Sequence, residues 1–190
     1  MATRSSCLLL GFVTGCAATV AVALIVTKRR ISKKNSTDKS SRCRQIPDEI
    51  RDEQLSRHLL YFGQDGMTKL KQSRVLVVGV GGVGSHVAHM LARSGIGYIS
   101  FVDFDQVSVS SLNRHACATL DDVGRSKVQV LYDYLTRICP DPRFLQLEPV
   151  VAMYSRETAP EIMKDGNFDI VVDCIDDVPT KGESYGAIRA

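Results

Sequence analysis

Apolar and polar residues alternate along the middle of the chain in the rhythm of strands and helices taken in turn. Short β-branched runs such as 75–78 are bounded by glycine and are too short for a helix, so they predict buried strands. Longer runs with apolar residues three and four apart predict helices. The expected order is strand 75–78, helix 83–94, strand 98–102, helix 126–138, strand 144–147, a short helix near 160–164 and strand 169–172. This alternation predicts an α/β domain with a parallel sheet and helices on both faces.

Two helices are expected ahead of the first strand. Pro47 opens the first helix, acidic residues occupy its early turns at Asp48 and Glu49, and Gly63 follows its end. A second, shorter helix over 67–71 leads into the strand. The folded domain is therefore expected to begin with Pro47.

A hydrophobic segment near the amino terminus predicts a transmembrane anchor over residues 1–27. Residues 7–26 contain 16 apolar residues and no charge. At about 1.5 Å per residue, their length matches a hydrocarbon core of roughly 30 Å. Five cations in 28–34, against Arg4 alone on the other side, place the following domain in the cytosol. A cleaved signal peptide is the alternative, although its apolar region is ordinarily shorter and its positive charge lies in front.

The next segment, residues 28–46, is polar, serine-rich and basic. Residues 28–44 hold eight Lys or Arg and one Asp, a charge of +7, whereas the chain from residue 45 onward is mildly acidic. This composition predicts a flexible linker whose cations lie on anionic lipid headgroups. Binding of RNA by the same cations is the alternative.

Composition places the remainder among ordinary globular domains. Hydrophobic residues make up 44% of the 190 residues and charged residues 24%, which excludes a disordered or collagen-like chain. The six cysteines form no C-x-x-C pair, so a disulfide scaffold and a cysteine-bound zinc are poor fits and a reduced compartment is expected. The four histidines, His58, His86, His89 and His115, are expected to be packing or surface residues.

A glycine-rich turn predicts a nucleotide site. Residues 79–84 read GVGGVG at the turn from a strand into a helix. Gly79 permits the tight turn, Gly81 lets the backbone approach an anion, and Gly84 allows close packing of the helix. Asp103, at the end of the next strand, is placed to accept hydrogen bonds from ribose hydroxyls. The motif predicts a Rossmann-like sheet with a bound nucleotide; a glycine-rich turn without a ligand is the alternative.

Charged residues near other strand ends help to decide whether the predicted nucleotide is ATP or a nicotinamide dinucleotide. Arg114 in a loop, Lys127 at the opening of a helix and Asp176 after the last strand supply two cations and a carboxylate. Chemistry at the α-phosphate of ATP needs such groups, because cations and a metal offset the developing negative charge. A nicotinamide cofactor needs little beyond the glycines and Asp103, so an NAD-dependent oxidoreductase stays open. The alternative for each of these three residues is a role without a ligand, as a surface charge or a turn residue.

Several stretches together resemble a known family. They are SRHLLYFG at 56–63, SRVLVVGVGGVGSHVAHML at 73–91, FVDFDQVSVSSLNRHA at 101–116, VGRSKVQVL at 123–131 and DIVVDCIDD at 169–177. They resemble the ubiquitin-activating-like adenylating enzymes, which include the activators of the molybdopterin and thiamine sulfur carriers. Within that superfamily, SSLNRHA and the amino-terminal span make the chain most similar to the tRNA threonylcarbamoyladenosine dehydratases, in particular the fungal, membrane-anchored type of the mitochondrial outer surface.

The resemblance implies roles for the matching residues. Gly81 would lie against the nucleotide, Asp103 would hold the ribose and Asp176 would coordinate Mg²⁺. Arg57 would contact the γ-phosphate of a partner subunit, since the family works as dimers. The implied catalytic residues are Arg57, Arg114, Lys127 and Asp176, and the implied nucleotide-binding residues are Gly79, Gly81, Gly82, Gly84, Asp103, Asp105, Ser110, Asn113, Arg114, Lys127, Asp176 and Asp177. Ser111 and Asp177 stand where relatives often have asparagine.

The resemblance also implies a reaction. ATP and Mg²⁺ would activate the threonine carboxylate of threonylcarbamoyladenosine in tRNA, and the urea group of the same nucleoside would close a ring. An activator of a ubiquitin-like or sulfur-carrier protein and a non-catalytic, membrane-tethered scaffold are the alternatives. Residues 180–190 do not continue the pattern. The adenylation domain over 47–179 is therefore expected to be incomplete, and the 190-residue chain inactive.

Overall fold

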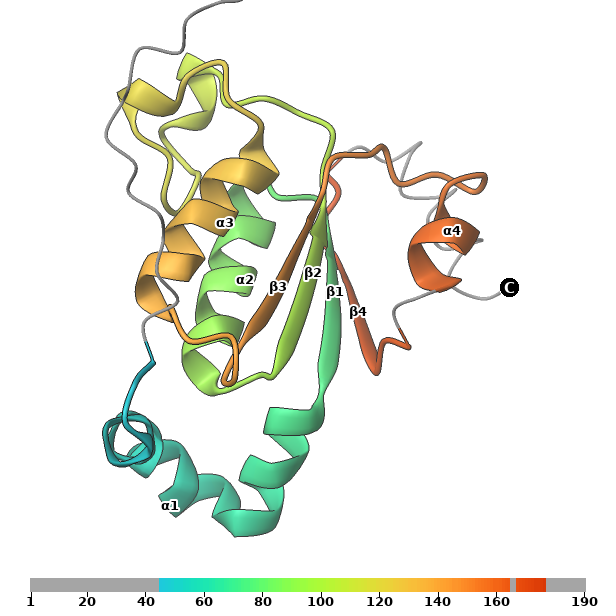
Figure 1. Ribbon diagram of the computed structural model, residues 1–190. Coiled ribbons are helices and arrows are strands. Elements are labelled where there is room, and N and C mark those ends of the chain that lie inside the picture. Colours follow the sequence, from blue (N-terminus) through green and yellow to red (C-terminus); the bar gives the residue numbers. More distant parts are fainter. Residues whose placement is uncertain (1–44, 165–166, 177–190) are drawn as a thin grey trace, which may run out of the picture. The chain divides into compact units, whose positions relative to one another are not determined.

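The computed structural model describes residues 45–164 and 167–176 (Figure 1). The anticipated membrane span over 7–26, nearly all of the basic linker and the divergent tail over 180–190 lie outside these residues. Within the described part of the chain, no helix is both long enough and apolar enough to cross a bilayer.

Four parallel strands form one sheet in the spatial order β3-β2-β1-β4. The strands are β1 (Arg74–Val78), β2 (Tyr98–Val102), β3 (Gln146–Val150) and β4 (Ile170–Asp173). The chain moves outward from β1 to β3 and then returns to place β4 on the other side of β1. In such sheets the carboxyl ends of the strands flank a crevice where this reversal occurs, and ligands bind there.

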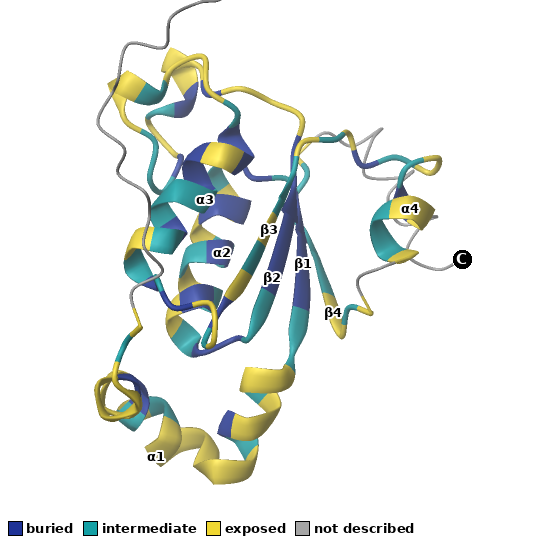
Figure 2. Ribbon diagram, viewed as in Figure 1, coloured by how far each residue is buried: buried dark blue, intermediate teal, exposed yellow. Residues whose placement is uncertain are grey.

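Helices cover both faces of the sheet, as the sequence predicts (Figure 1). Helices α2 (Gly82–Ser94) and α3 (Lys127–Ile138) lie on one face, and the short α4 (Ala159–Lys164) lies on the other. Figure 2 shows the buried residues concentrated in β1, β2 and the helix faces against them. Phe101 and Leu131 belong to the larger core cluster, on the side of α2 and α3, whereas Leu76 belongs to the smaller cluster on the side of α4.

Helix α1 (Asp48–Gln72) is two helices joined at Gly63, where the backbone adopts φ +68°. This left-handed conformation is inexpensive only for glycine, so the break falls at the predicted residue. Leu55 from the first arm and Met67 from the second are both buried, and both approach Gly95 at the end of α2. The two arms therefore meet at the carboxyl end of α2.

The third strand begins later than the sequence predicts. The backbone N–H groups of Phe144 and Leu145 both donate to the carbonyl of Asp141, so these residues close a turn. Pairing with the neighbouring strand starts when the N–H of Gln146 donates to the carbonyl of Gly97. The predicted strand 144–147 is therefore wrong by two residues at its start. Residues 144 and 145 have β-propensity, but their backbone N–H groups are used in the turn and do not pair with β2.

The same turn holds the chain where it enters the domain. The backbone N–H of Ile46 donates to Oδ2 of Asp141 at 2.9 Å, and Arg143 donates to the carbonyl of Ile46 at 2.9 Å. Arg143 is also hydrogen-bonded to the fully buried Asp141 at 2.7 Å. Because this turn precedes β3, Ile46 is fastened at the amino edge of the sheet.

Candidate nucleotide site

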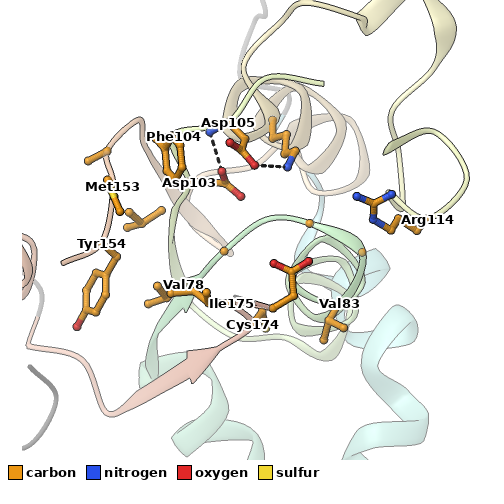
Figure 3. A pocket seen from close by; sticks show the side chains of 17 residues that line it. Val78, Val83, Asp103, Phe104, Asp105, Arg114, Met153, Tyr154, Cys174 and Ile175 are labelled. Carbon is orange, nitrogen blue, oxygen red and sulfur yellow. Dashed lines mark hydrogen bonds and ion pairs between the residues drawn. The ribbon is translucent and has the colours of Figure 1, made fainter. Parts of the chain in front are cut away.

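A cavity of about 450 Å³ opens at the carboxyl ends of the strands, where β1 lies between β2 and β4 (Figure 3). It is lined by Val78, Gly79, Gly81, Gly82, Val83, Val102, Asp103, Phe104, Asp105, Arg114, Lys127, Ala152, Met153, Tyr154, Cys174, Ile175 and Asp176. Thus most residues of the predicted site, although spread over nearly one hundred positions, meet around one space.

The glycine turn between β1 and α2 has the three predicted properties. Gly79 adopts φ +86°, and a Cβ there would lie 3.1 Å from the backbone of Cys174, the residue directly after β4. A Cβ on Gly84 would lie only 1.8 Å from the carbonyl oxygen of Gly79. A Cβ on Gly81, by contrast, would meet no protein atom within 4 Å. The turn therefore leaves open space over Gly81 at the start of α2, where free backbone N–H groups favour an anion.

The carboxylate of Asp103 stabilises the glycine turn through a hydrogen bond. It is only 9% exposed, and its Oδ2 accepts the backbone N–H of Val80 at 2.6 Å while Oδ1 accepts the N–H of Asp105 at 2.8 Å. The sequence predicts only a contact between Asp103 and ribose; the support of the turn is a second role. Each carboxylate oxygen has two lone pairs, so both oxygens can still accept from a ribose hydroxyl.

Lys127 and Asp105 form an ion pair on the cavity wall. The ammonium Nζ lies 2.7 Å from Oδ2 of Asp105, and the side chain of Lys127 is about nine-tenths buried. Asp105 is half exposed and is drawn with this contact in Figure 3. The cation is thus held at the opening of α3, facing the cavity that it lines.

Arg114 lies across the start of α2. Its Cγ and Cδ crowd Gly82, where a Cβ would lie 3.2 Å from both atoms. Its guanidinium donates to the carbonyl of Ser110 at 2.7 Å and to Oδ1 of Asn113 at 3.2 Å. Ser110 and Asn113 therefore orient the Arg114 side chain. Neither residue lines the cavity. Their contact with phosphate stays a prediction.

The remaining candidates are placed differently. Asp176 is exposed and lines the cavity just after β4. Arg57 is exposed on α1 and does not line the cavity, and Asp177 lies outside the described residues. Among the described residues no three His, Cys, Asp or Glu side chains gather into a metal cluster. Magnesium bound to nucleotide phosphates needs only one or two carboxylates, so Asp176 fits that use.

An apolar wall completes the cavity, and sequence reasoning missed it. In Figure 3, Phe104, Met153 and Tyr154 gather on one side of the space and Arg114 lies on the other. Burial raises the pKa of the Tyr154 phenol, with a further contribution from the negative charge of Asp173. The sequence could have indicated Phe104, because it directly follows the predicted site residue Asp103. Met153 and Tyr154 were hidden because the third strand was expected to end too early.

These features define a class of protein: a doubly wound parallel sheet whose glycine turn, carboxylates and cations surround a cavity suited to a nucleotide, with phosphate-binding groups opposite an apolar wall. The sequence profile of the ThiF family matches residues 55–183. The chain belongs to the ThiF family, which confirms the resemblance found in the sequence.

Individual relatives sharpen the comparison. The chain is 40% identical over 149 residues to tRNA threonylcarbamoyladenosine dehydratase 2 of Saccharomyces cerevisiae, covering 78% of this chain and 32% of the relative. It is 39% identical over 125 residues to tRNA threonylcarbamoyladenosine dehydratase of Bacillus subtilis, covering 66% of this chain and 48% of the relative. The chain thus spans between a third and a half of these relatives' lengths.

A solved structure shares the fold. The crystal structure of the Escherichia coli tRNA N6-threonylcarbamoyladenosine dehydratase in complex with ATP superimposes with a TM-score of 0.69 at 28% sequence identity. The match covers 76% of this chain and 58% of that one. The parallel α/β architecture is therefore that of an ATP-binding relative.

Proposed function

We propose that this chain is the ATP-binding part of an adenylating enzyme that activates the threonine carboxylate of threonylcarbamoyladenosine in tRNA. The observation that carries the proposal is the open space over Gly81, bordered by Arg114, Lys127 and Asp176 at the carboxyl edge of the sheet. The substrate rests on the dehydratase relatives, because no residue of the cavity identifies tRNA by itself.

The site supplies what adenylation requires. A substrate carboxylate oxygen bonds to the α-phosphorus of ATP, the bond from that phosphorus to the bridging oxygen breaks, and pyrophosphate leaves. Negative charge spreads over the phosphoryl oxygens in this step, and Arg114 and Lys127 would offset it electrostatically. Asp176 would hold Mg²⁺, which neutralises the departing pyrophosphate. The apolar wall of Phe104 and Met153 would take the base.

The second step needs no protein nucleophile. The urea group of the threonylcarbamoyl side chain attacks the activated carbonyl carbon, AMP leaves with the former carboxylate oxygen, and a ring closes with overall loss of water. An intramolecular attack of this kind is fast once its two groups are held close together. The protein's part is then to position the nucleoside and exclude water.

Three further parts of the proposal rest on the sequence. Residues 7–26 would anchor the chain in a membrane, proposed to be the mitochondrial outer membrane, with the domain in the cytosol. A second copy of the chain would bring its own Arg57 to the γ-phosphate. The location of Arg57 outside the cavity of its own subunit is compatible with this arrangement.

Isothermal titration calorimetry of the purified 190-residue chain tests the nucleotide. MgATP is expected to bind with a Kd near the micromolar range, and NAD⁺ is expected to give no heat at the same concentrations. Binding of NAD⁺ in place of MgATP would instead indicate an oxidoreductase, and binding of neither would indicate a scaffold.

The substrate needs a separate assay. ATP–pyrophosphate exchange by the purified enzyme is expected to require tRNA carrying threonylcarbamoyladenosine, with unmodified tRNA as the matched control. Exchange that depends instead on a carrier protein with a free C-terminal glycine carboxylate would favour the carrier-activating alternative.

A further inference from the structure

A buried hydroxyl connects the glycine turn to the loop that carries Arg114. Ser85, in the first turn of α2, is fully buried. Its Oγ donates to the carbonyl of Gly81 at 2.7 Å and accepts the backbone N–H of Ala116 at 3.0 Å. Ala116 lies 31 residues further along the chain, so one side chain joins two segments that are remote in sequence.

Among the hydrogen bonds of the described residues, only the one between Ala116 and Ser85 joins the loop over 108–118 to the turn, and the stem of Arg114 lies against Gly82 without a hydrogen bond. Arg114 is bound within its own loop, through its guanidinium to Ser110 and through its backbone N–H to the carbonyl of Ser111 at 3.1 Å. The described hydrogen bonds of Arg114 therefore fix its shape but not its distance from Gly81. The Ser85–Ala116 contact supplies that distance, two residues after the arginine.

We propose that Ser85 is a positioning residue that sets the Arg114 guanidinium against the phosphates lying over Gly81. The inference rests on the proposed function, since it requires that the cavity bind ATP. Groups that are held in place before binding lose less conformational freedom when the ligand arrives. Loss of the Ser85 hydroxyl should therefore weaken the binding of phosphates, while the binding of a nucleoside without phosphate should be unaffected.

Calorimetry with MgATP and with adenosine separates these contributions. Ser85→Ala is expected to raise the Kd for MgATP by about tenfold and to leave the Kd for adenosine within about twofold. The matched control is Ser94→Ala on the same helix, because the Oγ of Ser94 also donates to a carbonyl four residues earlier, at 2.8 Å, but is exposed. The control is expected to bind both ligands like wild type.

A second comparison asks whether Ser85 acts through Arg114. In an Arg114→Ala background, Ser85→Ala is expected to add less than about twofold to the Kd for MgATP. An undiminished loss in that background overturns the proposal, as does an equal loss for MgATP and adenosine in the wild-type background. Unchanged MgATP affinity in Ser85→Ala overturns it too.

Two controls keep the test decisive. If wild type does not bind MgATP, the proposed function fails and this inference fails with it; if wild type binds and Ser85→Ala binds equally well, only this inference fails. Circular-dichroism melting accompanies each variant. If Ser85→Ala does not fold, Ser85→Cys keeps a hydrogen-bonding atom at this position, although a larger and weaker one, and a smaller but still phosphate-specific loss is expected.

Discussion

Lys127 and Asp105 are joined twice, once by their side chains and once by their backbones. The ammonium group lies 2.7 Å from Oδ2 of Asp105, and the backbone N–H of Lys127 donates to the Asp105 carbonyl at 3.0 Å. These contacts connect the start of α3 to the loop after β2. They hold a nearly buried cation at the wall of the cavity.

Removal of this cation should weaken nucleotide binding selectively. Lys127→Ala is expected to raise the Kd for MgATP by about tenfold or more, because the proposed charge-assisted contact with phosphate would be lost. Adenosine affinity should change little. Lys164→Ala, an exposed lysine on α4, is the matched control in calorimetry, and an equal loss in both variants would contradict the assignment.

Two alanine substitutions in the glycine turn should have opposite consequences. Gly84→Ala forces a Cβ to within 1.8 Å of the Gly79 carbonyl oxygen, so the free energy of unfolding should fall by about 2 kcal/mol or more. Gly81→Ala meets no protein atom, so stability should stay within about 0.5 kcal/mol of wild type.

The Gly81→Ala variant should also be affected in its affinity for MgATP. The methyl group of Gly81→Ala occupies the space proposed for a phosphate, so MgATP affinity should fall by about tenfold while the fold remains intact. Chemical denaturation and calorimetry on both variants provide the check. Normal MgATP binding by Gly81→Ala would place the phosphates elsewhere.

The turn at Asp141 should make stability depend on acid. Hydrogen bonds from Arg143 hold the pKa of the Asp141 carboxyl well below its usual range. A depressed pKa means that the stabilisation is present above the unfolded-state pKa, about 3.9, and is lost as the pH falls below it. Asp141→Asn should therefore lower the melting temperature by a few degrees at pH 7.

The difference from wild type should shrink as the pH falls below about 3.9, because the unfolded chain then binds a proton at Asp141 that the folded protein does not bind. Asp121→Asn, in an exposed position, is the control and should melt like wild type at every pH. A constant difference between Asp141→Asn and wild type across this range would show that the charge of Asp141 is not what stabilises the turn.

His115 should be neutral near pH 6.5. Its ring is buried, and Nδ1 accepts the backbone N–H of Ala118 at 3.2 Å, so the neutral ring carries its proton on Nε2. Burial lowers the pKa of His115, and the positive charge of Lys127 lowers it further, against the opposing carboxylates of Asp103 and Asp122. Nitrogen-15 NMR of the imidazole should report this tautomer.

A lowered pKa means that the stabilisation by His115 is present above about pH 6.5 and is lost as the pH falls through the folded-state value. His115→Ala should therefore be less stable than wild type by about 1–2 kcal/mol at pH 8, with a smaller difference at pH 5. Lys69→Ala, exposed on α1 and not among the charges that shift the pKa of His115, is the control. A larger difference at pH 5 would mean that the charged ring is the stabilising form.

Features of the fold that depend on short stretches of chain were predictable from sequence. The break at Gly63 and the separate requirements at Gly79 and Gly84 follow from local backbone geometry, and the structure has each of them. The alternation of strands and helices likewise predicts a parallel sheet, because hydrophobic period and segment length are local properties.

Features that depend on remote neighbours were not predictable. The second role of Asp103 requires Val80 to lie beside it, and the link from Ser85 to Ala116 joins two separate segments. The apolar wall at Met153 depends on where β3 ends, at Val150, three residues beyond the predicted end. Side-chain chemistry indicated the ligand class, whereas the partners of each side chain required the folded chain.

The hydrogen bonds of Asp141 and Arg143 to the backbone of Ile46 have a practical consequence. Residues ahead of Ile46 join the domain at the amino edge of the sheet, and the cavity opens at the carboxyl edge. An affinity handle or fluorescent protein that replaces residues 1–44 would therefore be attached at the edge of the sheet opposite the mouth of the cavity.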